Sequence, residues 1–202
     1  RFYSAQPRTI AAVTGTNGKT SVAFFTQQLW NTLNCRAAAL GTLGVRGPGL
    51  DGGPSLTTPD PIELHRVLAS LKQQGIDFLA MEASSHGLSQ YRLDGVKLRA
   101  AAFTHLTRDH LDYHGDMEHY RAAKRRLFAE LLPSDGIAVL NAESGEFDAL
   151  RGLAEDRGQQ VISYGLRTGN ISCADAVASD AGWQLQLNIF GERFDCTFPL
   201  PG

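Results

Sequence analysis

The sequence predicts an α/β fold, a mostly parallel sheet of the P-loop type that is flanked by helices and carries a small antiparallel β hairpin near the C-terminus. First, short apolar runs alternate with segments of helical periodicity. Second, a glycine-rich loop at residues 15–20 separates an apolar run from an amphipathic one. Third, the last part of the chain changes to strict alternation of apolar and polar residues.

Composition indicates one globular domain. The chain has 202 residues, of which 43% are hydrophobic and 20% are charged. A net charge of −2 argues against a broad nucleic-acid surface, and no apolar run is long enough to span a membrane. We expect no nucleic-acid partner, no membrane span and a monomeric state.

The cysteines and the chain ends add two expectations. Cys35, Cys173 and Cys196 are scattered along the chain, which predicts free thiols in a reducing compartment such as the cytoplasm. The chain begins at Arg1 and stops at Gly202. We expect it to be a piece of a longer protein.

The elements follow from the apolar pattern. The predicted strands lie at 10–13, 37–41, 77–82, 100–106, 136–141 and 160–164. The predicted helices lie at 20–33, 61–74, 117–132 and 144–157. The helix at 61–74 has a clear beginning, with Asp60 as N-cap, Pro61 at the first helical position and Glu63 as capping-box partner. Residues 45–59 are rich in Gly and Pro and predict a surface loop.

The C-terminal part predicts the hairpin. Apolar residues alternate with polar ones on both sides of a turn at Gly191-Glu192, at Trp183, Leu185, Leu187 and Ile189 and then at Phe194, Cys196 and Phe198. This period of two is typical of antiparallel strands, which we place at the margin of the sheet. We assign them to architecture rather than to chemistry.

The glycine-rich loop predicts phosphate binding. Backbone N–H groups in such a loop point at anionic oxygens, and the following helix adds a favourable dipole. Lys19 can reach the outer phosphates, and the Thr20 hydroxyl can bind Mg²⁺. An ordinary tight turn is the alternative, but the flanking strand and helix favour phosphate. Val13 stands where the usual pattern has its first glycine, so the loop is a shortened variant.

Ligands of parallel sheets bind beyond the carboxyl ends of the strands, so the residues after each strand are candidates. Glu82 ends an apolar strand and could hold Mg²⁺ directly or through water. A solvated strand end is the alternative, and the nearby phosphate loop favours the metal. The residues that follow suit an anionic or sugar-like substrate, although each also fits an ordinary loop: Ser84, His86, Gln90 and Arg92.

Two further features do not establish a functional site on the residues alone: the first is undecided, and the second favours a structural role. Residues 107–115 are dense in titratable groups, and a neutral His there could bind a cation, but a polar loop with capping aspartates fits equally well. Lys124 lies on the apolar stripe of the helix at 117–132. Such a lysine usually extends its amine to the rim, and the alternative is a desolvated amine with a lowered pKa.

Several stretches together resemble the Mur ligase family. Residues 15–20 resemble the ATP loop of Mur ligases and folylpolyglutamate synthetases. The other stretches are similar to the family members that add the third residue of the peptidoglycan stem peptide: Leu56-Thr57-Thr58-Pro59, 81–88, 106–115 and Tyr120-Arg121-Ala122-Ala123-Lys124. The resemblance runs from about residue 9 to the end. It implies that residues 1–202 are the central ATP-binding domain of a three-domain enzyme, slightly incomplete at the C-terminal end.

The resemblance also implies the site residues. It places ATP on Gly15, Thr16, Asn17, Gly18, Lys19, Thr20 and Ser21. It places the muramoyl substrate on Thr57, Thr58, Ser84, Gln90 and Arg92. It places Mg²⁺ on Thr20, Glu82, His110 and a carbamylated Lys124, and catalysis on Lys19, His110 and Lys124. Carbamylation needs a neutral amine. The resemblance therefore favours a desolvated Lys124 amine over one that extends to the rim.

Two positions depart from the family pattern. His105 and Leu56 stand where relatives often carry Asn, so His105 receives no inherited role and one substrate contact near Leu56 is in doubt.

The implied activity is an ATP- and Mg²⁺-dependent amide ligation in peptidoglycan synthesis. The expected substrates are UDP-N-acetylmuramoyl-L-Ala-D-Glu and a third amino acid, for which we expect meso-diaminopimelate rather than L-lysine. We expect the isolated fragment to be inactive. The alternatives are another ligase of the superfamily and a nucleotide-binding module without turnover.

Overall fold

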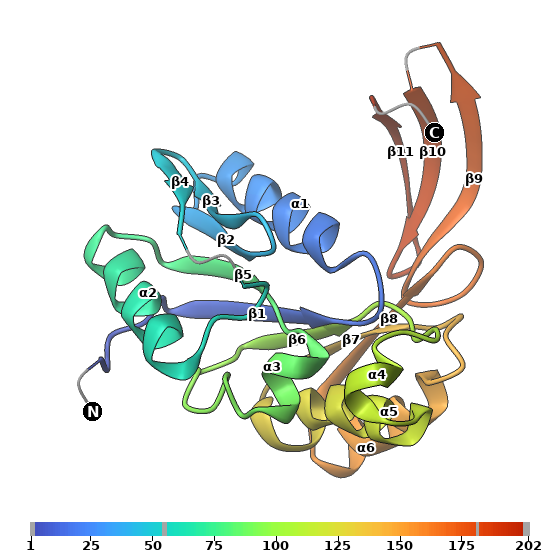
Figure 1. The fold of residues 1–202 in the computed structure, drawn as a ribbon. Helices are drawn as coiled ribbons and strands as arrows, with labels where there is room; N and C mark the ends of the chain where they lie inside the picture. The colour runs from blue at the N-terminus through green and yellow to red at the C-terminus, as the bar shows by residue number, and fades with distance from the viewer. Residues whose placement is uncertain (1–2, 54–55, 181, 200–202) are drawn as a thin grey trace.

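The computed structural model describes residues 3–53, 56–180 and 182–199. In these ranges the strands form one sheet in the order β11-β10-β9-β8-β7-β6-β1-β5-β2-β3-β4 (Figure 1). The central strands are parallel and the two margins are antiparallel. The predicted fold class is therefore confirmed.

The parallel core brings the site together. Its strands are β1 (Thr9–Thr14), β2 (Ala37–Gly41), β5 (Phe78–Glu82), β6 (Ala100–Phe103), β7 (Ile137–Asn141) and β8 (Gln160–Gly165). Every residue of β2 is buried, as expected for a strand that is covered on both faces. Because β1 lies between β5 and β6, the segments that follow these three strands leave the sheet at one edge.

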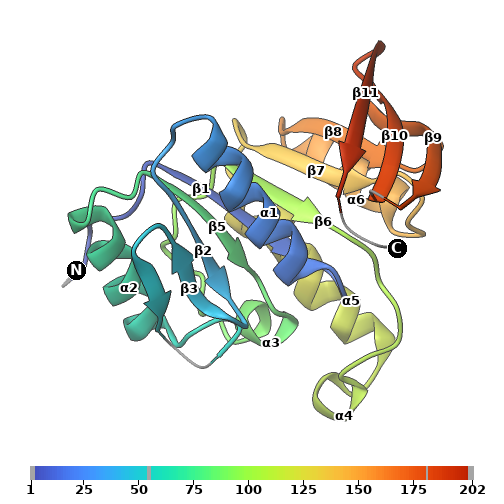
Figure 2. The ribbon, with the colours of Figure 1, turned by 90° about the horizontal axis from the view of Figure 1, so that it is seen from above.

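The helices cover the two faces unequally (Figures 1 and 2). They are α1 (Lys19–Thr32), α2 (Pro61–Gln73), α3 (Ser85–Ser89), α4 (Leu111–His114), α5 (Met117–Arg126) and α6 (Phe147–Asp156). Helix α1 packs alone on one face through a small cluster that includes Val13, Ala23 and Ala80. The opposite face carries the main core, to which α2, α3, the region after α5 and α6 contribute buried leucines and Phe128.

The antiparallel strands extend the sheet on both sides. They are β3 (Gly44–Gly47) and β4 (Leu50–Gly52) on one margin, and β9 (Ile171–Ser179), β10 (Gly182–Ile189) and β11 (Glu192–Phe198) on the other. Strands β9 to β11 project away from the parallel core (Figures 1 and 2). The predicted C-terminal hairpin is β10 with β11, and the sequence reading missed the third strand, β9.

The structure corrects three element predictions. Residues 45–59 are not simply a loop, because β3 and β4 form a hairpin on the edge of β2, and positive φ values at Gly44 and Gly49 allow its turns. Pro54 and Ser55 of this segment lie outside the described residues. The strand predicted at 100–106 ends at Phe103.

The third correction concerns the helix predicted at 117–132. Helix α5 passes into the π-helical turn η1 (Leu127–Leu131), where the Leu132 N–H donates to the Leu127 carbonyl over five residues.

The beginning of α2 is mostly as predicted. Asp60 accepts hydrogen bonds from the backbone N–H groups of Ile62 and Glu63, at 3.0 and 3.1 Å, and Pro61 opens the helix. The capping-box role of Glu63 is wrong, because Arg66 donates to both oxygens of the Glu63 carboxylate, at 2.8 and 2.7 Å. Arg66 lies one turn further along the same helix, and its charged guanidinium binds the Glu63 carboxylate in place of the backbone N–H of Asp60.

Within the described ranges, none of the helices has both the length and the apolar character that crossing a bilayer would require.

Replacing Asp60 by Ala removes two hydrogen bonds to the first turn of α2. We expect the free energy of unfolding to fall by about 1 kcal/mol, measured by urea denaturation. Asp156→Ala is the matched control, because Asp156 lies exposed in the last turn of α6. Equal losses in both variants would contradict the capping role.

Candidate active site

A cavity of about 200 Å³ lies at the carboxyl edge of the parallel strands. It collects residues that are far apart in the sequence: Thr16, Asn17, Gly18, Lys19, Thr20, Thr42, Thr57, Glu82, Ser84, Ser85, His110 and Lys124. All four predicted metal-binding residues and all three predicted catalytic residues are in this lining. Of the other predicted residues, Gly15, Ser21, Thr58, Gln90 and Arg92 lie outside it.

The glycine-rich loop is hydrogen-bonded to the segment that follows β6. The Thr16 N–H donates to the His105 carbonyl at 2.8 Å, and the Thr104 hydroxyl donates to the Asn17 carbonyl at 2.7 Å. Gly15 has φ +140°, and a Cβ there would lie 1.8 Å from the Thr104 hydroxyl oxygen. Only glycine fits this approach. The strand predicted to reach residue 106 ends at Phe103, and the residues that follow bond to the loop instead.

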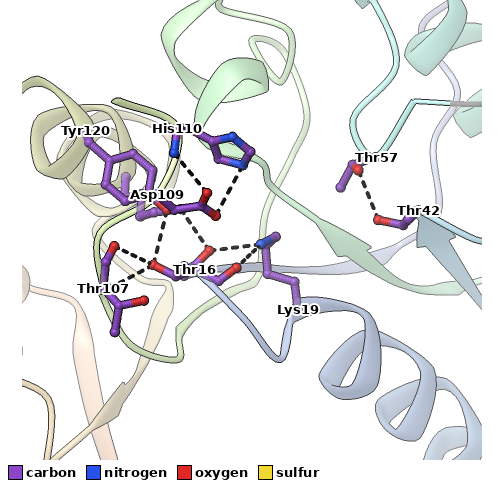
Figure 3. Close-up of polar contacts among 10 residues, drawn as sticks. Thr16, Lys19, Thr42, Thr57, Thr107, Asp109, His110 and Tyr120 are labelled. Carbon is purple, nitrogen blue, oxygen red and sulfur yellow. Dashed lines mark hydrogen bonds and ion pairs between the residues drawn. The ribbon is translucent and has the colours of Figure 1, made fainter. Parts of the chain in front are cut away.

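The Thr16 side chain is the anchor of the loop (Figure 3). Its hydroxyl oxygen accepts from the Thr107 N–H at 2.9 Å and donates to the Thr107 carbonyl at 3.2 Å. The Tyr120 hydroxyl lies 3.1 Å from that of Thr16, and either hydroxyl can donate in this pair. Thr16 therefore shapes the loop, and its hydroxyl faces the protein.

Lys19 lies across the mouth of the loop. Its amine donates to the carbonyls of Gly15 and Thr16, at 3.0 and 2.8 Å. Desolvation lowers the pKa of Lys19, although Glu82 and Asp109 partly oppose this. Among the residues that the structure describes, its hydrogen-bond partners are backbone carbonyls, and a cation held in this way is suited to bind an incoming phosphate.

Lys124 is buried, and the expectation from the residues alone that its amine would reach the rim is wrong. The side chain is 1% exposed, and its amine donates to the Gly15 carbonyl at 2.8 Å. The amine also lies 4.5 Å from the centre of the Tyr120 ring. Burial, together with the nearby Lys19, lowers the pKa of Lys124 to about 7. A large fraction of the amine is thus neutral near pH 7.

Glu82 is a buried carboxylate at the end of β5. It is 2% exposed and accepts from the Thr42 N–H at 2.9 Å and from the Thr42 hydroxyl at 3.3 Å. A Cβ at Gly41 would lie 2.1 Å from the carboxylate, so the end of β2 makes room for it. The Thr42 hydroxyl also contacts that of Thr57 at 2.9 Å (Figure 3). The sequence prediction missed Thr42, although it directly follows the parallel strand β2.

Thr58 holds the backbone of Glu82 and Ser84 in place. Its hydroxyl donates to the Glu82 carbonyl and accepts from the Ser84 N–H, both at 3.0 Å, and the residue is 1% exposed. Arg92 donates to the Thr58 carbonyl at 2.7 Å. The Ser84 hydroxyl caps α3 by accepting from Gly87. In this structure Thr58 therefore supports its neighbours and does not face the cavity.

His110 opens α4 in a left-handed conformation, with φ +51°. Its ring lies 3.4 Å from the Asp109 carboxylate (Figure 3). The centres of the His86 and His110 rings are 5.0 Å apart. Burial lowers the pKa of His86, and the charges of His110 and Arg92 lower it further.

The lining fits a hard divalent cation. A hydroxyl at Thr20, a buried carboxylate at Glu82 and an imidazole at His110 face one cavity, and oxygen donors are what Mg²⁺ prefers. Within the described part of the chain, no group of three or more His, Cys, Asp or Glu residues is arranged for a metal. A cation here would thus rely on the hydroxyl of Thr20 and on other oxygen donors.

Comparison with known proteins gives the family. Residues 13–202 match the family described as "Mur ligase middle domain". The chain is 58% identical over its whole length to a protein of Rhizobium meliloti (strain 1021) named "UDP-N-acetylmuramoyl-L-alanyl-D-glutamate--2,6-diaminopimelate ligase". The chain covers 41% of that relative, so it spans well under half the length of the curated proteins it matches.

Two solved structures resemble the fold. One, titled as a UDP-N-acetylmuramoyl-L-alanyl-D-glutamate--2,6-diaminopimelate ligase, is 35% identical with a TM-score of 0.86, over 97% of this chain and 40% of that one. The other is a Mycobacterium tuberculosis folylpolyglutamate synthase complexed with ADP and AMPPCP. It is 18% identical with a TM-score of 0.75, over 98% of this chain and 51% of that one, and at this identity shows a shared fold alone.

The low pKa of Lys124 predicts a pH-dependent stability. Between about pH 7 and 10.5 the Lys124 amine is neutral in the folded protein and charged in the unfolded one, so unfolding takes up a proton. The free-energy cost of burying this amine is therefore complete below pH 7 and vanishes at high pH. Lys124→Met in the full-length protein should therefore raise the melting temperature by a few degrees at pH 6 and by much less at pH 10.

Calorimetry in buffer free of CO₂ and Mg²⁺ checks this expectation, with the exposed Lys97 replaced by Met as control. A difference between Lys124→Met and wild type that is the same at both pH values would contradict the buried neutral amine.

Proposed function

The chain belongs to the Mur ligase family, whose middle domain its residues 13–202 match, and from this premise we propose that it is the ATP-binding domain of a MurE-type ligase. In the full-length protein this enzyme would join meso-diaminopimelate to UDP-N-acetylmuramoyl-L-Ala-D-Glu. The observation that carries the proposal is the single cavity in which the phosphate loop, Glu82, His110 and the buried Lys124 meet. Thr57 and Ser84 line the same cavity, which supports a substrate surface beside the proposed phosphate site.

The proposed reaction has two steps. An oxygen of the terminal D-Glu carboxylate attacks the γ-phosphorus of ATP, and ADP leaves, giving an acyl phosphate. The amine of the third amino acid then attacks the acyl carbon. The amide bond forms as inorganic phosphate leaves, and the amine loses a proton.

The substrate carboxylate and the γ-phosphate are both anions, and this chain would supply cations that reduce their repulsion. The N–H groups of the glycine-rich loop and the amine of Lys19 would hold the phosphates, and the amine would exchange its backbone carbonyls for phosphate oxygens. Arg92 would hold the substrate carboxylate. Thr20, Glu82 and His110 would bind Mg²⁺, which when bound supplies further neutralisation of the developing charge.

Lys124 is suited to carbamylation. CO₂ adds to a neutral amine, so that a new N–C bond forms, one proton is released and the product is an anion. The lowered pKa leaves about half of the amine neutral near pH 7, and its hydrogen bond to the Gly15 carbonyl holds it at the loop. The carbamate would add oxygen donors to those of Thr20 and Glu82.

The remaining contacts belong to the rest of the proposed three-domain enzyme. The chain covers 43% and 41% of two of its curated relatives, so we propose that other domains bind the uridine group and the incoming amino acid and complete the nucleotide site. The diaminopimelate assignment rests on the names of those relatives.

Two rivals are less well supported. A folylpolyglutamate synthase shares the fold at 18% identity, whereas the diaminopimelate ligases reach 58%. A module that only binds nucleotide would not need a buried neutral lysine beside the phosphate loop.

Replacing Lys19 by Ala in the full-length enzyme should lower ligation by about a hundredfold or more, because the phosphate loses its mobile cation. Release of phosphate and formation of the tripeptide product, followed by chromatography, measure this. Near-normal product formation by this variant would contradict the assignment to an ATP-dependent ligase of this type.

A substrate panel with the wild-type enzyme serves as the companion measurement. It offers UDP-muramoyl dipeptide or a folate as acceptor, and diaminopimelate, L-lysine or L-glutamate as amine. Turnover of folate with L-glutamate would transfer the assignment to the first rival, and no turnover of any pair would favour the second.

Replacing Lys124 by Ala should lower turnover of the full-length enzyme strongly, by about a hundredfold, because the carbamate donors are lost. Short-chain carboxylates added to the assay should restore part of the activity by occupying the vacated space. Lys97→Ala, which changes an exposed lysine, should leave turnover unchanged. Full activity of Lys124→Ala would refute the carbamate role.

A further inference from the structure

Tyr113, on α4, contacts α3 and the residue that follows it. Its hydroxyl accepts from the Gln90 side-chain amide at 2.9 Å and lies 3.2 Å from the Ser89 hydroxyl. Its ring stacks on that of His86, with 4.0 Å between the ring centres. The side chain is 43% exposed, so these contacts are not those of a core residue.

The Tyr113 hydroxyl holds the end of the Gln90 side chain that faces away from Arg92. With its NH₂ group donating to Tyr113, the amide turns its oxygen towards Arg92. That oxygen accepts from the Arg92 Nε at 3.0 Å and from one terminal nitrogen of the same guanidinium. The guanidinium, which only donates, sets the orientation of the amide, and the hydrogen bond to the phenol holds the Gln90 side chain in position as an acceptor for Arg92.

Arg92 is held in place by neutral oxygens. Gln90 holds one side of its guanidinium, and the Thr58 carbonyl accepts from the other side at 2.7 Å. Across the described ranges, Arg92 has no carboxylate within ion-pair distance, whereas Arg126 pairs with both Asp94 and Glu130. Arg92 therefore keeps its full charge for an external anion, in an orientation set by Gln90.

The same phenol holds α4 against α3. Helix α4 has four residues, and the residues that flank it, His110 with φ +51° and Gly115 with φ +80°, both have positive φ. The contacts of Tyr113 with Ser89 and Gln90 join this short helix to α3 and the residue after it. Tyr113 thus links His110, three positions earlier, to the arginine that faces the substrate.

We propose that Tyr113 is a positioning residue that acts through Gln90 to hold Arg92 in register for a carboxylate of the peptide substrate. The proposal rests on the function proposed above and adds a residue to its substrate side. Because Tyr113 acts on the orientation of another side chain, its loss affects substrate binding more than the chemical step.

The experiment uses the full-length enzyme and the variant Tyr113→Phe. The KM for UDP-muramoyl dipeptide should rise about three- to tenfold, since one hydrogen bond that orients Gln90 is lost, while kcat and the KM for ATP change little. Calorimetric titration with the dipeptide should show the same fold-change in Kd. Tyr91→Phe is the matched control, because Tyr91 is 61% exposed with its ring under Arg126, and it should leave all values unchanged.

A double-mutant cycle separates positioning from a general structural effect. Gln90→Ala alone should weaken dipeptide binding, and adding Tyr113→Phe to that variant should cause no further loss. Independent, additive losses would overturn the proposal, and so would wild-type affinity in Tyr113→Phe. If the wild-type enzyme itself fails to bind the dipeptide, the proposed function falls and takes this inference with it.

Discussion

The Gly15 carbonyl accepts hydrogen bonds from the amines of both Lys19 and Lys124, and the rest of the site is arranged around this shared acceptor. Two ammonium groups cannot be held so close in a buried space without strong repulsion. Lys124 is the more deeply buried, so its pKa falls to about 7. The result is one amine suited to phosphate and one suited to reaction as a neutral base.

That arrangement depends on the order of the strands. Strand β1 lies between β5 and β6, so the phosphate loop leaves the sheet beside Glu82 on one side and beside the Thr104 to Thr107 segment on the other. This segment clamps the loop through Thr16 and Asn17. Helix α5 then brings Lys124 and Tyr120 beneath the loop from the opposite direction.

Sequence patterns predicted well whatever depends on neighbouring residues. The glycine-rich loop between β1 and α1, the Asp60 cap and the antiparallel strands β10 and β11 follow from local signals, and each of these structures is present as expected. The failures involve competition between distant groups. Glu63 was expected to cap α2 but pairs with Arg66, and residues 45–59 fold into a hairpin because the edge of β2 offers a partner.

By itself the sequence determined the fold class, the phosphate loop and the candidates after each strand, because parallel strands place their carboxyl ends at one edge. Only the tertiary structure decided how deeply each group is buried and which polar groups it meets. It buried Lys124 instead of leaving its amine at the rim, turned Thr58 inward and joined Tyr113 to Gln90. Desolvation and hydrogen-bond competition depend on packing between segments that the sequence holds far apart.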